Sequence, residues 1–185
     1  MNDKKNILYA DDDYESINIL FRLRAPSLFI GLVLGVIISI LVSRFEEVLS
    51  KNIQIAFFLP FVVYIANAIG AQTGNIYARD LKSGRAKFSK YFRKELLLGV
   101  IFGLIFGIVS GVIIFLWLGN IFLAFSVAAS TCLAIAVAPT VALVITYMFQ
   151  FLHDDPAAYS GPIATVIQDM ISVVIYGIIS SIILL

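Results

Sequence analysis

The feature that most constrains this 185-residue chain is a series of long apolar runs. From Leu96 to Leu152 the sequence contains no charged side chain, and further apolar runs lie before and after that stretch. About 20 apolar residues are needed for a helix to cross a hydrocarbon core about 30 Å thick. The chain is 61% hydrophobic and 14% charged, whereas soluble domains are about 45–50% apolar and about 25% charged. We therefore predict an all-α, multi-pass integral protein of the cell membrane.

Five apolar runs are long enough to span a bilayer, and they predict five transmembrane helices. The third and fourth runs are separated only by the sequence LGN, and Pro139 lies inside the fourth. Proline lacks a backbone N–H, so a kink or break is expected near residues 135–139. The runs cover residues 25–43, 53–78, 96–118, 121–149 and 161–185.

The distribution of basic residues predicts the orientation of these spans. The connection 79–94 contains seven Lys or Arg residues and one acidic residue before Glu95, whereas residues 44–51 contain two basic and two acidic residues. Because cytoplasmic loops carry an excess of Lys and Arg, segment 79–94 is predicted to be cytoplasmic, with the N-terminus inside and the C-terminus outside. Residues 1–24 are predicted to form a cytoplasmic arm, and residues 25–185 a single five-helix domain. Nothing in this pattern favours a nucleic acid as partner.

Asp169 is an acidic residue inside the fifth predicted span, about 13 Å along the helix from Ser160 and so close to the bilayer midplane. A charged side chain at that depth costs roughly 2.5–3.5 kcal/mol, and such residues generally mark transport pathways. Polar residues recur with it at spacings of three or four, which places them on one helical face. These residues are Thr165, Ser172, Tyr176 and Ser180. The stripe predicts a cation path, and the alternative is an interhelical hydrogen-bond seam that holds a protonated Asp169.

A second polar concentration, NAIGAQTGN, lies in the second predicted span. Its amides, hydroxyl and backbone carbonyls are the oxygen ligands that hard cations prefer, and the sequence offers no His or Cys cluster for softer metals. Gly70 and Gly74 are equally consistent with close helix packing, whereas the glycines at every fourth position from Gly99 to Gly111 are predicted to form a helix-packing ridge. The predicted path-lining residues of the motif are Asn67, Gly70, Gln72, Thr73, Gly74 and Asn75.

Three further acidic residues lie near predicted span ends, where they could form a pore mouth. Glu46 follows the first span, where solvation at the membrane surface is the simpler account. Glu95 precedes the third span and could instead pair with a loop cation. Asp155 precedes Pro156 and could instead cap the last helix.

The last-span sequence DPAAYSGPIATVIQD, followed by ISVVIY, resembles the last-helix signature of the MgtE magnesium transporters and their eukaryotic solute-carrier relatives. GAQTGN similarly resembles the glycine- and amide-rich motif of that family's second helix. Departures from the family pattern include Gln72 and Gln168 in place of Asn, and Val166 in place of Thr. The resemblance covers residues 24–176, in the membrane part of the family, so control by the family's cytoplasmic sensor domain is not carried over.

The resemblance implies a homodimer in which an ion path between subunits is lined by the second and fifth helices. Asp169 would be the metal-binding carboxylate, contributed by each subunit, and Mg²⁺ the transported ion. This ion prefers octahedral oxygen ligands and sheds water reluctantly, so a site with few carboxylates and retained waters suits it. The alternatives are transport of Ca²⁺, Co²⁺ or Mn²⁺, or a non-transporting membrane scaffold. An aspartyl protease is disfavoured because it needs two neighbouring carboxylates, so the chain is predicted not to be an enzyme.

Overall fold

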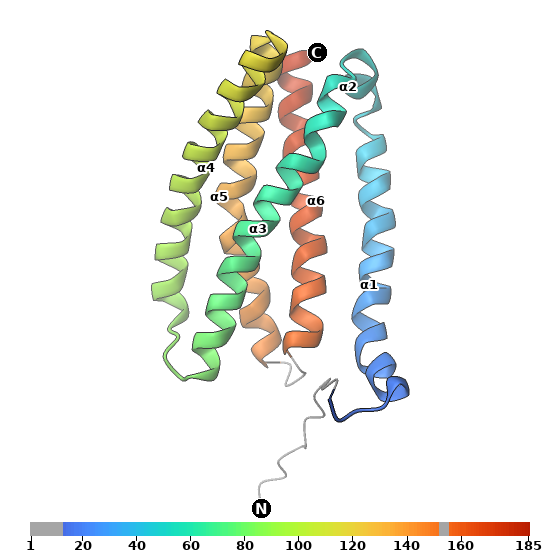
Figure 1. The fold of residues 1–185 in the computed structure, drawn as a ribbon, viewed down its shortest axis with the longest axis vertical. Helices are drawn as coiled ribbons and strands as arrows, with labels where there is room; N and C mark the ends of the chain where they lie inside the picture. The colour runs from blue at the N-terminus through green and yellow to red at the C-terminus, as the bar shows by residue number, and fades with distance from the viewer. Residues whose placement is uncertain (1–12, 152–155) are drawn as a thin grey trace, which may run out of the picture.

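The computed structural model describes residues 13–151 and 156–185 as a bundle of long helices (Figure 1). Five helices are long and apolar enough to cross a membrane, and they correspond in order to the five predicted spans. The short helix α2 between the first two was not predicted. The helices are α1 (Ile17–Ser43), α2 (Glu46–Lys51), α3 (Gln54–Lys82), α4 (Phe88–Leu118), α5 (Ile121–Phe151) and α6 (Pro156–Leu184).

The long helices run alternately up and down, and α5 lies at the centre of their contacts (Figure 1). It packs against α3, α4 and α6. Half of the residues in its most apolar 18-residue stretch are buried, compared with 6% in the corresponding stretch of α1. Helix α1 packs mainly on α6, where Gly31 approaches the side chain of Val166. The core is therefore built around α5, and α1 presents most of its surface outward.

The glycines of α4 form its packing surface against α5, as predicted. Gly99, Gly103 and Gly107 are buried. A Cβ atom added to Gly103 would lie 2.4 Å from the carbonyl oxygen of Cys132, and one added to Gly107 would lie 2.7 Å from that of Ala128. Only glycine permits this approach, because any side chain would meet the backbone of α5.

The short connection between α4 and α5 confirms the boundary that the LGN sequence predicts. Gly119 adopts a left-handed conformation with φ of +66°, and its N–H bonds to the carbonyl of Phe115. The Asn120 side chain then accepts a hydrogen bond from the N–H of Leu123 at 3.1 Å, which satisfies a free donor at the start of α5. A left-handed glycine and an amide cap together reverse the chain within two residues.

The helices extend beyond the apolar runs that predicted them. The basic connection predicted at 79–94 is mostly helical, because α3 continues to Lys82 and α4 begins at Phe88. Likewise α1 begins at Ile17 and continues through Pro26. Lys and Arg favour helices and carry their charge to the membrane surface on long apolar stems, so the end of hydrophobicity does not mark the end of the helix.

No break occurs at Pro139, because α5 continues through it from Ile121 to Phe151. Prolines are tolerated in membrane helices when neighbouring helices and local adjustments satisfy the freed backbone groups. Pro139 is itself fully buried, and its ring atoms approach the position of Gly99 on α4. The proline thus contributes to the packing of α4 on α5.

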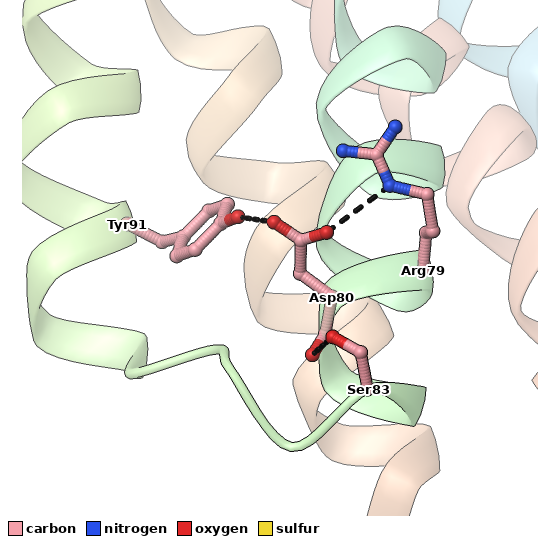
Figure 2. A network of polar contacts seen from close by, with 4 residues as sticks. All are labelled: Arg79, Asp80, Ser83 and Tyr91. Carbon is pink, nitrogen blue, oxygen red and sulfur yellow. Dashed lines mark hydrogen bonds and ion pairs between the residues drawn. The ribbon is translucent and has the colours of Figure 1, made fainter.

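The turn from α3 to α4 is held by a hydrogen-bond network around Asp80 (Figure 2). One carboxylate oxygen accepts a bond from Nε of Arg79 at 3.1 Å, and the other accepts one from the Tyr91 hydroxyl on α4. The Ser83 hydroxyl donates to the Asp80 carbonyl at 2.9 Å, and Gly84 makes the left-handed step with φ of +70°. Asp80 therefore joins the end of α3 to the start of α4.

Candidate ion-binding site

Asp169 lies in the middle of α6, and its side chain is partly buried. Its carboxylate Oδ1 accepts a hydrogen bond from the amide Nδ2 of Asn67 on α3. No other hydrogen bond to this carboxylate forms within the described ranges 13–151 and 156–185. The structure thus brings together one residue from each of the two polar motifs, and it leaves part of the carboxylate available to a further ligand.

The glycines of the α3 motif pack against α5. A Cβ atom added to Gly70 would lie 3.3 Å from the carbonyl oxygen of Ala138, and one added to Gly74 would lie 3.4 Å from the hydroxyl of Thr146. These two positions serve close packing between α3 and α5, which is the alternative that the sequence left open.

The polar residues of the same motif point in different directions. Thr73 is buried and donates a hydrogen bond to Glu95 Oε2 on α4 at 2.7 Å. Gln72 and Asn75 are exposed. The motif is therefore distributed over several faces of α3, and Asn67 is its member that bonds to Asp169.

The polar residues along one face of α6 differ in burial on the two sides of Asp169. Toward the C-terminus, Ser172 and Tyr176 are buried, whereas Thr165 on the N-terminal side is exposed. The Tyr176 hydroxyl donates to the carbonyl of Ile55 on α3 at 2.7 Å, and Ser180 shares a 3.0 Å hydrogen bond with Ser126 on α5. The C-terminal half of the stripe is thus an interhelical hydrogen-bond seam, and Asp169 lies where that seam meets an exposed surface.

Gln168 is a neighbouring residue that sequence reasoning did not select. It is 3% exposed, and its Nε2 donates to the Ser172 hydroxyl at 3.2 Å. Its Oε1 is buried and has no hydrogen-bond partner in the described parts of the chain. The sequence shows only an amide directly before an intramembrane acid and four residues before a serine, and it does not show that the amide is buried.

The acidic residues predicted for the pore mouths have different surroundings. Glu46 is exposed at the start of α2. Glu95 bonds to Thr73 and forms no ion pair with the cations described around it. Asp155 lies outside the described residues. Glu47, next to Glu46, bonds to the Lys51 ammonium at 2.7 Å, which lowers the pKa of its carboxyl.

The donor set favours a hydrated ion over a fully enclosed one. Among residues 13–151 and 156–185, no group of three His, Cys, Asp or Glu side chains is placed to hold a metal. One chain offers a carboxylate and an amide at the centre of the site. A cation that keeps most of its water shell needs few direct protein ligands.

Residues 59–179, which include both motifs, match the MgtE family, described as divalent cation transporters. This chain belongs to the MgtE family. It is a multi-pass membrane protein of a transporter family and not of an enzyme family.

Two relatives named magnesium transporter MgtE align with most of this chain. The protein of Bacillus subtilis strain 168 is 28% identical over 187 aligned residues, which cover 90% of this chain. The protein of Enterococcus faecalis strain V583 is 30% identical over 161 residues, or 85% of this chain. These alignments cover 41% and 36% of the respective relatives, so this chain spans about two-fifths of their length. The resemblance that its motifs indicated is confirmed.

Proposed function

We propose that this MgtE chain transports a divalent cation, Mg²⁺ before others, along a path at a homodimer interface lined by α3 and α6. The observation that carries the proposal is the partly exposed Asp169, held in mid-helix by Asn67. An intramembrane carboxylate is costly unless it faces water or a partner, and a cation path supplies both. Its charge attracts the ion, and the Asn67 amide fixes the direction in which the carboxylate points.

A second copy of the chain would complete the site. Two Asp169 carboxylates across a two-fold axis would present two formal negative charges to a dication that retains its water shell. The N-terminus would lie in the cytoplasm, where the basic end of the α3–α4 hairpin is also expected. The names of the two relatives favour Mg²⁺ as the ion over Ca²⁺, Co²⁺ or Mn²⁺.

Flux measurements on purified protein in liposomes test the role of Asp169. We expect Asp169→Asn and Asp169→Ala to lower Mg²⁺ flux strongly while the protein stays folded. A unit charge about 5 Å from a divalent ion interacts with it by about 7 kcal/mol at an effective dielectric constant of about 20, and retaining only about 1.4 kcal/mol of that is already tenfold in ion binding. Glu47→Gln is the matched control, because it removes a carboxylate that is exposed at the surface of the same chain. Unchanged flux in both Asp169 variants would remove this residue from the path.

Cross-linking tests the dimer separately. In a Cys132→Ser background, Asp169→Cys should be joined to its copy by a short bis-maleimide, and Mg²⁺ flux need not be retained for this measurement. Ile108→Cys on the outward face of α4 is the control, since Ile108 is 65% exposed and lies on a helix that the proposed interface does not use. Efficient linkage at residue 108 and none at residue 169 would contradict the proposed interface.

The rival function is a non-transporting scaffold in which Asp169 serves only as a partner for Asn67. In that case wild-type protein would show no Mg²⁺ flux above empty liposomes, and Asn67→Ala would lower stability alone. For a transporter, Asn67→Ala should also lower flux, because the carboxylate loses the donor that orients it. The two measurements together separate the functions.

A further inference from the structure

We propose that the outward face at the N-terminal end of α4 binds the headgroup of an anionic phospholipid. This basic face consists of Lys87, Lys90, Arg93 and Lys94, all of which are exposed. None of the four forms an ion pair with any residue that the structure describes. Clusters of four to eight basic residues beside a membrane span are typical binding sites for acidic lipids.

The acidic residues of the same region are turned away from the basic face. Asp80 is occupied by Arg79 and Tyr91 at the turn between the helices (Figure 2). Glu95 is occupied by Thr73 on α3. Neither carboxylate lies among the four cations as an internal counterion, so an external anion is left to balance them.

Aromatic contacts fix which side of α4 faces outward. The Phe88 ring lies 4.5 Å from the Tyr147 ring on α5, and the Tyr91 ring lies 5.0 Å from the buried Tyr77 ring on α3, measured between centroids. These rings occupy the inner side of the first turns of α4. Because these rings face α3 and α5, the exposed basic residues of the same turns lie on the outer side of α4.

The basic face continues directly into a lipid-facing apolar surface. From Lys90 and Lys94, steps of three and four residues along α4 reach side chains that are 42–65% exposed. These are Leu97, Ile101, Leu104 and Ile108. A phospholipid matches this order, with its phosphate at the lysines and its acyl chains along the apolar residues. A soluble phosphate or an acidic polypeptide would use only the charged part.

Native mass spectrometry of the purified chain in detergent tests the proposal. Bound phosphatidylglycerol is compared with phosphatidylcholine of the same acyl chains, for wild type, Lys90→Gln/Lys94→Gln and Arg44→Gln/Lys51→Gln. The last variant removes two cations at the opposite end of the bundle and serves as the matched control. Each basic residue is worth about fivefold in association with an acidic lipid, so we expect a roughly ten- to thirtyfold loss of phosphatidylglycerol binding in the first variant. We expect little loss in the control.

Lys90→Arg/Lys94→Arg keeps both charges and should retain binding, and the melting temperature of each variant verifies that it is folded. Binding should also weaken as salt is raised, because the contacts lie at the surface. An equal loss in both charge-removal variants, or no preference for phosphatidylglycerol, would overturn the proposal. So would equally tight binding of glycerol phosphate without acyl chains, which would identify a soluble-phosphate site instead.

Discussion

The packing of α4 on α5 predicts that a glycine-to-alanine substitution in α4 lowers stability, whereas the same substitution in an ordinary helix raises it. Replacing glycine by alanine in a helix usually gains up to about 1 kcal/mol. At Gly103 the new methyl group would lie 2.4 Å from the Cys132 carbonyl oxygen, and its next contacts are also backbone atoms of α5. A flexible side chain could move aside, but here two helices must separate.

Overpacking of this kind costs about 1–3 kcal/mol, which outweighs the gain in propensity. For a chain of this size, 1 kcal/mol shifts the melting temperature by about 2–4 °C. We therefore expect Gly103→Ala to lower the melting temperature by roughly 2–10 °C in detergent, measured by the loss of monodisperse protein in size-exclusion chromatography after heating.

Gly35→Ala is the control for this substitution. Gly35 also lies inside a membrane helix, and a Cβ atom there would meet nothing within 4 Å. The control should leave the melting temperature unchanged or raise it slightly. If both variants shift it equally, the close approach of α4 and α5 does not determine the stability of this interface, and the reasoning from glycine contacts is refuted.

Two further predictions concern interhelical hydrogen bonds. Tyr176→Phe should lower stability by about 0.5–1.5 kcal/mol, because the Ile55 carbonyl loses its donor, whereas Tyr64→Phe, at a 70% exposed position, should have no effect on the melting temperature. Glu95→Ala should cost about 1–3 kcal/mol, because the buried Thr73 hydroxyl is left unpaired. Glu95→Gln keeps an acceptor and should restore the melting temperature; if the Gln variant melts as low as the Ala variant, the charge of Glu95 matters more than its hydrogen bond.

The sequence predicted the number and order of the spans because hydrocarbon thickness constrains apolar length directly. It also predicted the function of the glycine ridge and the α4–α5 boundary, since both depend on local chemistry. The sequence did not predict the helix ends within segment 79–94, because α3 and α4 both continue into its basic residues beyond the apolar runs. Hydropathy locates the hydrocarbon, and it says little about where a charged helix stops.

The site was harder to predict because the sequence does not specify how each helix is rotated against its neighbours. In α3, Asn67 bonds to Asp169 on α6, whereas Thr73, on another face of the same helix, bonds to Glu95 on α4. The spacing of four between Gly70 and Gly74 was equally compatible with a path and with packing, and tertiary contacts decide between them. The buried Oε1 of Gln168 could not be anticipated for the same reason.

The division of α6 at Asp169 bears on the proposed cation path. Beyond this residue, Tyr176 and Ser180 fix α6 to α3 and α5, whereas the preceding turn at Thr165 is exposed. A carboxylate at the end of a fixed segment is held in position by its own helix backbone and by Asn67, and it need not be enclosed to be oriented. The polar stripe is therefore a packing seam on one side of Asp169 and is exposed on the other, so the proposed cation path would use the exposed side.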